Sequence, residues 1–234
     1  MPAKFQGTVC FLLTKSVRSN MLISFEGLDF CGKSTQAHRL VERLKSERRE
    51  DGSQPTVHFL REPGGTAISE RIREMLLDRT NLEMSDLTEL LLFSASRAQL
   101  VEQVIRPAVA RGEIVVCDRY ADSTVAYQGW GRGIDLTTVK SIIAASIGAT
   151  IPDLTLFIDI PIDEIGRRKE SAGMQFDRME SAGRAFYERV RNGFLDIARS
   201  DPHRVSRIDG MQSIENVHAG VWTAVQERTK FHVL

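Results

Sequence analysis

The segment that most constrains the fold of this chain is the glycine-rich stretch Gly27-Leu28-Asp29-Phe30-Cys31-Gly32-Lys33-Ser34. It matches the pattern of Gly, four variable residues, Gly, Lys and Ser or Thr, in which main-chain N–H groups surround phosphates. An apolar run at 21–25 precedes it, and apolar residues at helical spacing follow it over 33–49. We therefore predict a strand, a loop that binds nucleotide phosphates with residues 27–35, and a helix, with Lys33 on the outer phosphates and Ser34 on Mg²⁺.

Length and composition are those of one α/β domain with a substantial core. The chain has 234 residues, 42% hydrophobic and 26% charged, and its formal net charge of zero gives no reason to expect a nucleic-acid or membrane partner. Cys10, Cys31 and Cys117 are too few and too unevenly spaced for a disulfide framework or a zinc site, which favours a reducing, cytoplasmic setting. We expect an N-terminal extension at 1–20 and a single domain at 21–234.

Short apolar runs alternate with helical stretches along the chain, which predicts a three-layer α/β fold. Such alternation is typical of a parallel sheet with helices on both faces and ligands at the carboxyl ends of the strands. The five predicted strands are 21–25, 56–60, 114–117, 154–158 and 204–208. The predicted helices after the first are 68–77, 86–105, 136–147, 181–198 and 214–229, and Pro107 is expected to end the second of these. A cationic segment bounded by glycines, at about 166–178, is expected to be mobile.

Polar residues follow each predicted strand, at the edge where a ligand is expected. They are the loop at 27–34, the segment Arg61-Glu62-Pro63-Gly64-Gly65-Thr66, the triplet Asp118-Arg119-Tyr120, Asp159, and Asp209 with Gly210. Asp118 ends an apolar strand and is expected to bind the metal through water, although a carboxylate that pairs with Arg119 or caps a turn is the structural alternative. For Asp159, a turn or cap role ahead of Pro161 stands beside metal binding.

Together these motifs resemble the thymidylate kinase family, which phosphorylates dTMP with ATP. The resemblance runs from about residue 21 to the C-terminus and rests on residues 25–29, 61–66, 118–120 and 127–135. It implies a P-loop kinase fold with a short basic lid at about 166–178, a homodimer, and transfer of the γ-phosphoryl group of ATP to dTMP. The helices that begin near Ile68 and Asp86 are candidate dimer faces. Another nucleoside monophosphate or deoxynucleoside kinase, or a noncatalytic nucleotide-binding switch, is the alternative.

The resemblance also implies which residues bind the acceptor. Arg61 and Arg119 would hold the dTMP phosphate with planar, fork-shaped donors, unless Arg61 pairs with Glu62 or another acid for folding alone. Phe93 and Arg97 lie four residues apart on one side of a helix, where Phe93 would stack on thymine and Arg97 would bond its carbonyl. Taken alone, Phe93 would more often be a core residue than a ligand contact, and the neighbouring motifs reverse that preference.

Further base and sugar contacts are implied by the same resemblance. Ser123 or Thr124 and Gln128 would complete recognition of the base, Tyr127 would disfavour a ribose hydroxyl, and Asp29 would contact the sugar or the reacting phosphate region. The glycines at 129, 131 and 133 are expected to form a closing loop, since no predicted strand leads into them.

Catalysis of this kind needs charge stabilisation more than a general base. A phosphate monoester with a second pKa of about 6 is largely dianionic at neutral pH and can attack without losing a proton to the protein. Some family members place an arginine in the phosphate loop, but Phe30 stands there in this chain, and other members supply lid arginines instead. The lid candidates are Arg167, Arg168 and Arg178, with a solvated position as the alternative for Arg167. The predicted catalytic residues are Lys33, Asp29, Arg119, Arg168 and Arg178.

Overall fold

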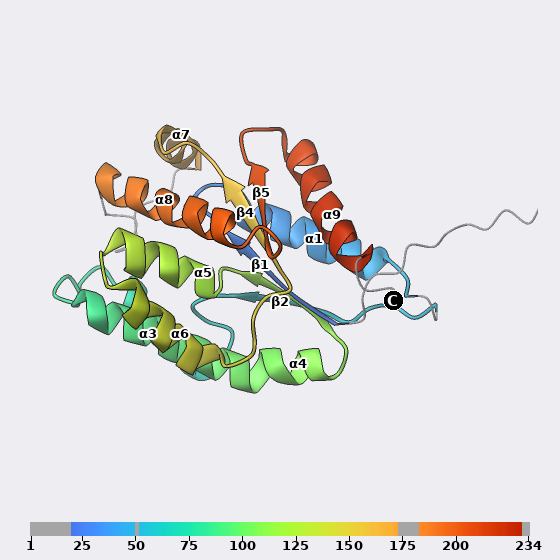
Figure 1. The fold of residues 1–234 in the computed structure, drawn as a ribbon, viewed down its shortest axis with the longest axis horizontal. Coiled ribbons are helices and arrows are strands. Elements are labelled where there is room, and N and C mark those ends of the chain that lie inside the picture. Colours follow the sequence, from blue (N-terminus) through green and yellow to red (C-terminus); the bar gives the residue numbers. More distant parts are fainter. Residues whose placement is uncertain (1–19, 50–51, 173–182, 231–234) are drawn as a thin grey trace, which may run out of the picture.

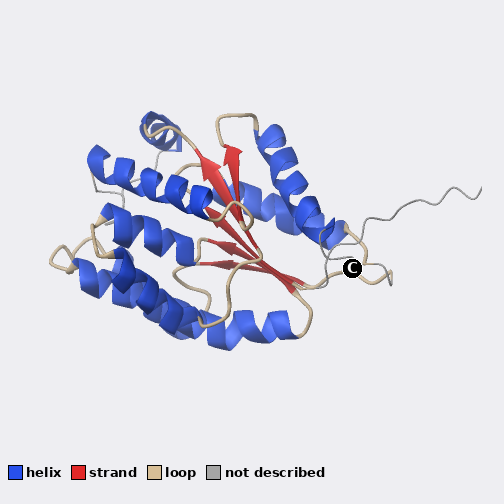
Figure 2. Cartoon of the chain, viewed as in Figure 1, coloured by secondary structure: helices blue, strands red, loops and turns tan. Residues whose placement is uncertain are grey.

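The computed structural model describes residues 20–49, 52–172 and 183–230, and its centre is a parallel sheet between layers of helices (Figures 1 and 2). The strands are β1 (Met21–Glu26), β2 (Val57–Arg61), β3 (Ile114–Asp118), β4 (Leu154–Asp159) and β5 (Val205–Asp209). Their order in the sheet is β2-β3-β1-β4-β5, and all neighbouring pairs are parallel. The prediction of a five-stranded parallel sheet is confirmed, and the alternation of apolar runs with helices placed every strand within one residue of its observed ends.

Helices fill the connections between the strands. They are α1 (Lys33–Ser46), α2 (Ala67–Leu77), α3 (Asp86–Leu100), η1 (Val101–Ile105), α4 (Arg106–Ala110), α5 (Ala121–Thr124), η2 (Val125–Gly131), α6 (Leu136–Ile147), α7 (Asp163–Ala172), α8 (Arg184–Ser200) and α9 (Ile214–Lys230), where η marks a π-helix. Side chains cap the starts of α2, α3 and α6, where Thr66, Ser85 and Asp135 each accept a hydrogen bond from the main-chain N–H three residues later. These caps fix where α2, α3 and α6 start.

The central strand β1 is buried on both sides, as a parallel sheet covered by two helical layers requires. Its side chains alternate between two apolar clusters. Met21, Ile23 and Phe25 belong to a cluster with α1, α8 and α9, whereas Leu22 belongs to a cluster with α3, η1, α4 and α6. The sheet is therefore held from both faces, and its strand ends keep a fixed register in which Phe25 lies beside Asp118 and Asp118 lies beside Arg61.

Pro107 does not end the helix that contains it, so that prediction was wrong. The helix α3 continues through the π-helical turn η1 into α4, and Pro107 is the second residue of α4. A π-helix bonds each N–H to the carbonyl five residues earlier, whereas an α-helix uses the fourth. The hydrogen-bond pattern changes at this junction, where a residue that lacks an N–H group is tolerated.

The glycines predicted to form a closing loop are mostly packing glycines, which corrects that prediction. Gly129 and Gly131 are buried within η2, and only Gly133 lies beyond its end. A Cβ atom on Gly129 would be 2.6 Å from Leu136, and one on Gly131 would be 2.7 Å from the ring of Phe186. These positions lack side chains because α6 and α8 approach the π-helix closely.

The expected lid and the expected N-terminal extension are only partly described. Residues 166–172 belong to the helix α7, a helix that the sequence analysis did not predict, and residues 173–178 lie outside the described residues. Residues 1–19 also lie outside the described part of the chain. The mobile lid and the domain boundary at residue 20 therefore stay predictions.

The packing at Gly131 predicts a loss of stability on substitution. Gly131→Ala is expected to lower the free energy of unfolding by about 1–3 kcal/mol, because the new methyl group overpacks the contact with Phe186 and Val190. Urea denaturation followed by circular dichroism measures the change. The matched control is Gly166→Ala on α7, where no heavy atom lies within 4 Å of the added Cβ and a gain of up to about 1 kcal/mol is expected. An unchanged free energy for Gly131→Ala would contradict the packing role.

Candidate active site

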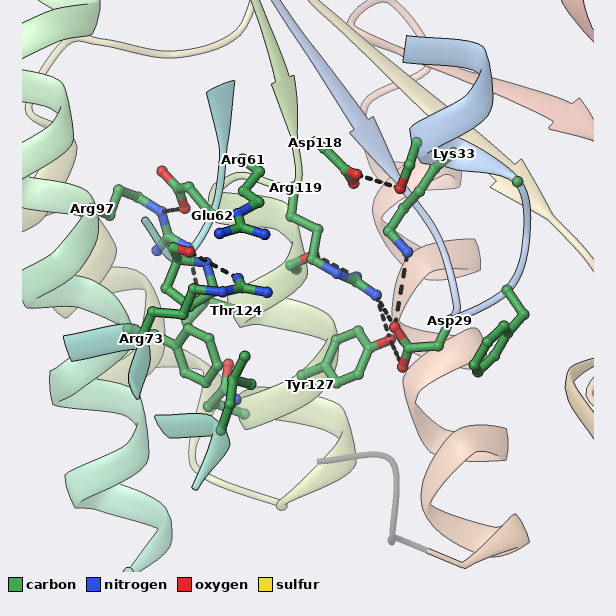
Figure 3. A pocket seen from close by; sticks show the side chains of 18 of the residues that line it. Asp29, Lys33, Arg61, Glu62, Arg73, Arg97, Asp118, Arg119, Thr124 and Tyr127 are labelled. Carbon is green, nitrogen blue, oxygen red and sulfur yellow. Dashed lines mark hydrogen bonds and ion pairs between the residues drawn. The ribbon is translucent and has the colours of Figure 1, made fainter. Parts of the chain in front are cut away.

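A cavity of about 610 Å³, here called the main cavity, lies at the carboxyl ends of β2, β3 and β1, where the parallel sheet was expected to bind its ligands (Figure 3). Its walls come from the phosphate loop, the segments after β2 and β3, and the helices α2, α3, α5, η2 and α7. The predicted site residues that line it are Asp29, Phe30, Gly32, Lys33, Ser34, Thr35, Arg61, Phe93, Arg97, Asp118, Arg119, Ser123, Thr124, Tyr127, Gln128 and Arg168. The structure thus brings most of the predicted residues to one place.

The phosphate loop has the backbone that its glycines require. Gly27 has φ of 140° and Gly32 has φ of 93°, both in the region that favours glycine. A Cβ atom on Gly27 would lie 2.4 Å from the carbonyl oxygen of Ile158, so the loop packs closely on the end of β4. Gly32 precedes the first turn of α1, whose free N–H groups and dipole favour an anion. Lys33 donates to the carbonyl oxygen of Leu28 at 3.3 Å, which keeps its ammonium group beside the loop.

Ser34 and Asp118 form the pair that was predicted to hold Mg²⁺. The Ser34 hydroxyl donates to Asp118 Oδ2 at 2.5 Å, and Asp118 Oδ1 is buried without a hydrogen-bond partner in the described part of the chain. Mg²⁺ is usually bound by one or two carboxylates together with water and substrate phosphates. The described residues contain no cluster of three or more His, Cys, Asp or Glu that could hold a metal. The pair therefore fits a Mg²⁺ ion whose coordination a nucleotide completes.

The guanidinium group of Arg119 joins the phosphate loop to the segment after β3. Its Nη1 donates at 3.0 Å to the carbonyl oxygen of Gly27 and at 3.0 Å to the Ser123 hydroxyl. Its Nη2 donates to Asp29 Oδ1 at 2.5 Å and to the Tyr127 hydroxyl at 3.1 Å. The main chain at Arg119 has a positive φ of 71°, which is uncommon for a residue other than glycine. Its partners therefore hold this side chain in one place.

Asp29 is the carboxylate that holds two cations together. It pairs with Arg119, lies 3.8 Å from the ammonium group of Lys33, and accepts a hydrogen bond from Tyr127 at 3.2 Å (Figure 3). Burial works against its ionisation, but the positive charges of Arg119 and Lys33 hold the pKa of Asp29 below its usual value. An ionised Asp29 thus fixes the positions of Lys33 and Arg119 relative to each other.

Arg61 and a residue that the sequence analysis missed, Arg73, form another cationic part of the main cavity. Arg61 ends β2, has a side chain that is 53% exposed, and makes a 3.4 Å contact with Glu70. Arg73 of α2 donates to the carbonyl oxygen of Pro63 at 2.9 Å. Figure 3 shows both guanidinium groups directed toward the same part of the cavity, between Arg97 and Arg119. Arg73 could have been found because α2 begins directly after the segment at 61–66, which brings its first turns to this edge.

Arg97 is buried and fixed by an acid that the sequence analysis named only as a folding partner for Arg61. Its Nε donates to Glu62 Oε2 at 2.7 Å and its Nη2 to the Thr124 hydroxyl at 2.9 Å. Burial raises the pKa of Glu62, and Arg97 opposes that rise. The Nη1 atom of Arg97 is buried without a hydrogen-bond partner among the described residues, and the residue lines the cavity. Phe93 is half-buried, lines the cavity and also packs against the core.

Gln128 is oriented by a second buried acid that sequence reasoning did not find. Its side-chain nitrogen donates to Glu89 Oε1 at 2.9 Å, and Arg132 pairs with Glu89 Oε2 at 3.0 Å. Glu89 lies in the first turn of α3, where acids are also common for helix-dipole reasons, so the sequence carried no distinct signal for this role. The Gln128 amide is consequently held in one orientation at the wall of the main cavity.

The three arginines proposed for the lid lie in different environments. Arg168 lines the main cavity, where it donates to the carbonyl oxygens of Phe30 and Cys31 at 3.4 and 3.3 Å and to that of Gly210 at 2.8 Å. Arg167 has a side chain that is 73% exposed and pairs with Glu164, which favours the solvated alternative. Arg178 lies outside the described residues. Arg168 thus braces the phosphate loop against the segment after β5.

Asp159, for which two roles stayed open, is an ion-pair residue away from the main cavity. It is buried at the end of β4 and accepts hydrogen bonds from Arg191 at 2.7 Å and from Arg207 at 2.6 Å. Both its oxygens face arginines, so this contact explains its burial better than a metal would.

Among the described residues, no helix is both long enough and apolar enough to cross a bilayer.

Comparison with known proteins shows which family the chain resembles. The sequence model of the family described as thymidylate kinase matches residues 25–221. A thymidylate kinase from Chlorobium luteolum is 45% identical over 218 residues, which cover 90% of this chain and 99% of the relative. A thymidylate kinase from Deinococcus radiodurans is 44% identical over 208 residues, which cover 89% of this chain and 97% of the relative.

A solved structure supports the same assignment. The crystal structure of thymidylate kinase from Ehrlichia chaffeensis matches 88% of this chain and 98% of its own, with a TM-score of 0.70 and 37% sequence identity. The phosphate loop, the arginines at the strand ends and the parallel sheet of this chain thus occur together in a fold shared with that enzyme. The chain belongs to the thymidylate kinase family.

Proposed function

We propose that dTMP binds in the main cavity with its phosphate between Arg61 and Arg119, and that ATP binds with its phosphates in the loop at 27–34. Membership in the family assigns the reaction, in which the γ-phosphoryl group of ATP passes to dTMP and gives dTDP and ADP. The observation that carries the placement is the shared cavity itself, since the phosphate loop, the Ser34–Asp118 pair and both guanidinium groups line it. Two anionic groups can therefore face each other there.

The chemistry follows from the charges around this junction. An oxygen of the dTMP phosphate attacks the γ-phosphorus of ATP, the bond from that phosphorus to the β–γ bridging oxygen breaks, and no proton has to leave the acceptor dianion. Asp29 fixes Lys33 and Arg119, which in this arrangement lie on either side of the transferred phosphoryl group. Prearranged cations lower the energy of the transition state because they need little reorientation as charge moves. Lys33, Arg119 and, by way of its hold on both, Asp29 are thus the proposed catalytic set, with Arg168 beside the phosphate loop. Arg178 stays a predicted catalytic residue.

Magnesium and base recognition complete the proposal. Ser34 and Asp118 would hold Mg²⁺, which when bound neutralises charge on the ATP phosphates. Phe93 stacks on the thymine, Arg97 donates to a thymine carbonyl, and Gln128 borders the base, since all three residues line the cavity. Ser123, Thr124 and Tyr127 form the wall near the sugar and base. A cytoplasmic setting stays a prediction that rests on the cysteine content.

We also propose that the chain is a homodimer, as the resemblance implies. Large apolar side chains are exposed on α2 and α3, two helices that pack against each other. Ile68 and Met75 lie seven residues apart on one face of α2, and Leu87 and Leu91 lie four apart on one face of α3. Apolar residues clustered on neighbouring helices are typical of an interface between subunits. A second copy of this chain is the proposed occupant of that face.

The choice of acceptor is tested by turnover with a panel of phosphate acceptors. A coupled assay of ADP release with dTMP, dUMP, UMP, CMP and thymidine is expected to give the highest kcat/KM for dTMP. The physical reason is that the cavity offers cations to an acceptor phosphate and a crowded wall at Tyr127 to a ribose 2′-hydroxyl. Comparable or better turnover of UMP or thymidine would contradict the proposal, and ADP release that does not depend on any acceptor would favour a hydrolase or switch.

The stacking role of Phe93 predicts a selective loss of acceptor affinity. Phe93→Ala is expected to raise KM for dTMP about tenfold with KM for ATP unchanged, because a lost base–aromatic stack costs about 1–3 kcal/mol. Steady-state kinetics with each substrate varied in turn measures the effect. The matched control is Phe59→Ala on β2, since Phe59 is also half-buried but packs on His38 outside the cavity. Equal effects of Phe93→Ala on both substrates would make Phe93 a core residue only.

The dimer is tested by placing a charge on its proposed face. Wild-type protein is expected to run as a dimer in size-exclusion chromatography with light scattering, and Leu91→Glu is expected to shift it toward the monomer because a buried carboxylate without a partner is costly. Ile151→Glu is the control, since Ile151 is 58% exposed but lies on the loop before β4. A monomeric wild type, or a Leu91→Glu variant that stays dimeric, would contradict this surface.

A further inference from the structure

Glu26 is a fully buried acid beside the active site that does not line the main cavity. It ends β1, directly before the phosphate loop, and its side chain turns toward the segment after β3. Its Oε1 accepts a hydrogen bond from the main-chain N–H of Tyr120 at 2.8 Å, and its Oε2 accepts one from the Ser123 hydroxyl at 2.5 Å. Both donors follow Arg119 closely in sequence, so Glu26 holds the main chain at Tyr120 and the side chain of Ser123, both C-terminal to Arg119.

A continuous chain of contacts leads from this acid to the arginine. The Ser123 hydroxyl donates its only hydrogen to Glu26 and uses a lone pair to accept from Nη1 of Arg119 at 3.0 Å. The main-chain N–H of Arg119 itself donates to the carbonyl oxygen of Phe25 at 2.9 Å. The end of β1 therefore holds the backbone before and after the positive-φ turn at Arg119, and through Ser123 it also holds the guanidinium group.

We propose that Glu26 is a positioning residue for the acceptor phosphate, which aims the guanidinium group of Arg119 by way of Ser123 and the Tyr120 N–H. This inference rests on the proposed function, in which Arg119 contacts the phosphate of dTMP. Glu26 touches neither substrate in that arrangement. Its effect is to keep Arg119 in the orientation that binds, so that binding dTMP does not have to pay for ordering a long side chain.

A carboxyl group of this length is the one side chain that meets both requirements. An ionised Glu side chain presents two acceptor oxygens, one for the Tyr120 N–H and one for Ser123. A Gln amide presents one acceptor, and its NH₂ group turned to Ser123 would leave the hydroxyl hydrogen of Ser123 without the acceptor that Glu26 provides. An Asp carboxylate is shorter by one methylene and does not reach both partners. Glu26→Gln is thus expected to loosen Ser123 and Arg119.

The electrostatic surroundings show that the Gln variant is a practical test. Burial raises the pKa of Glu26 to about 8, with a further rise from the charge of Asp122, while Ser123, the charge of Arg119 and the Tyr120 N–H lower it. A neutral amide of nearly the same shape therefore meets no charge penalty at this site. Asp122 has its own partner, Arg204, at 2.6 Å, and this pair stays in place in the variant.

The experiment measures binding of dTMP to the full chain by isothermal titration calorimetry at pH 9, where Glu26, with a pKa of about 8, is mostly ionised. Glu26→Gln is expected to raise Kd for dTMP about tenfold, by analogy with the lower end of what losing a residue that orients a metal ligand costs, and to leave Kd for ATP unchanged. The control is Asp159→Asn, which removes a buried carboxylate that ends the adjacent strand β4 and grips Arg191 and Arg207 away from the cavity. Asp159→Asn is expected to leave Kd for dTMP unchanged.

A double-mutant cycle separates positioning from a general structural effect. Because Glu26 acts largely through Ser123, the losses of dTMP binding free energy from Glu26→Gln and Ser123→Ala are expected to be non-additive. The double variant is expected to bind dTMP about as tightly as the single variant with the lower dTMP affinity. Independent, additive effects would overturn the inference. If Glu26→Gln does not fold by circular dichroism, Glu26→Asp replaces it, with the same increase in Kd for dTMP expected.

The outcomes for the inference and for the proposed function are distinct. A wild-type chain that binds dTMP, together with a folded Glu26 variant of equal dTMP affinity, overturns the positioning role alone. A Glu26 variant that weakens dTMP and ATP equally also overturns it, since the effect would then be structural. A wild-type chain that does not bind dTMP overturns the proposed function and the inference with it.

Discussion

The ion pair between Asp29 and Arg119 is the contact on which the active site depends. It joins the phosphate loop after β1 to the segment after β3, at a distance of 2.5 Å, and Asp29 also lies 3.8 Å from Lys33. Two polyanionic substrates repel each other, so the cations between them have to be in place before the substrates meet. A carboxylate that holds one cation from each binding region meets this requirement without blocking the cavity.

The parallel sheet makes that pair reachable. Register places Phe25, Asp118 and Arg61 side by side on three neighbouring strands, so the residues that follow them emerge at one edge. Buried acids then fix the arginines of this edge, as Glu62 does for Arg97 and Glu26 does through Ser123 for Arg119. Buried ion pairs add little net stability, because desolvation offsets the attraction, but they select one arrangement of charged groups. The burial of apolar side chains in the core beneath the site offsets the desolvation cost of these buried ion pairs.

Features that depend on residues close in sequence were predicted well, whereas features that depend on residues distant in sequence were not. The strands and the loop at 27–34 follow from local patterns, and they were placed closely because apolar runs and a glycine-rich motif act over a few residues. Pro107 and Gly131 were misjudged because π-helical turns and close helix packing depend on partners distant in sequence, such as Phe186 for Gly131. Of the arginines that line the cavity, Arg61, Arg97, Arg119 and Arg168 were predicted from resemblance and Arg73 was missed. Glu89, the buried acid that orients Gln128, gave no local signal and required the folded chain.

A crystal structure of the chain with dTMP and a nonhydrolysable ATP analogue tests the central claim most directly. Oxygens of the dTMP phosphate are expected to lie about 3 Å from guanidinium nitrogens of both Arg61 and Arg119, as hydrogen bonds to charged donors require. Arg119 is also expected to keep its contact with Asp29. A dTMP phosphate bound away from Arg119, or an Arg119 side chain that leaves Asp29 and turns out of the main cavity, would contradict the account.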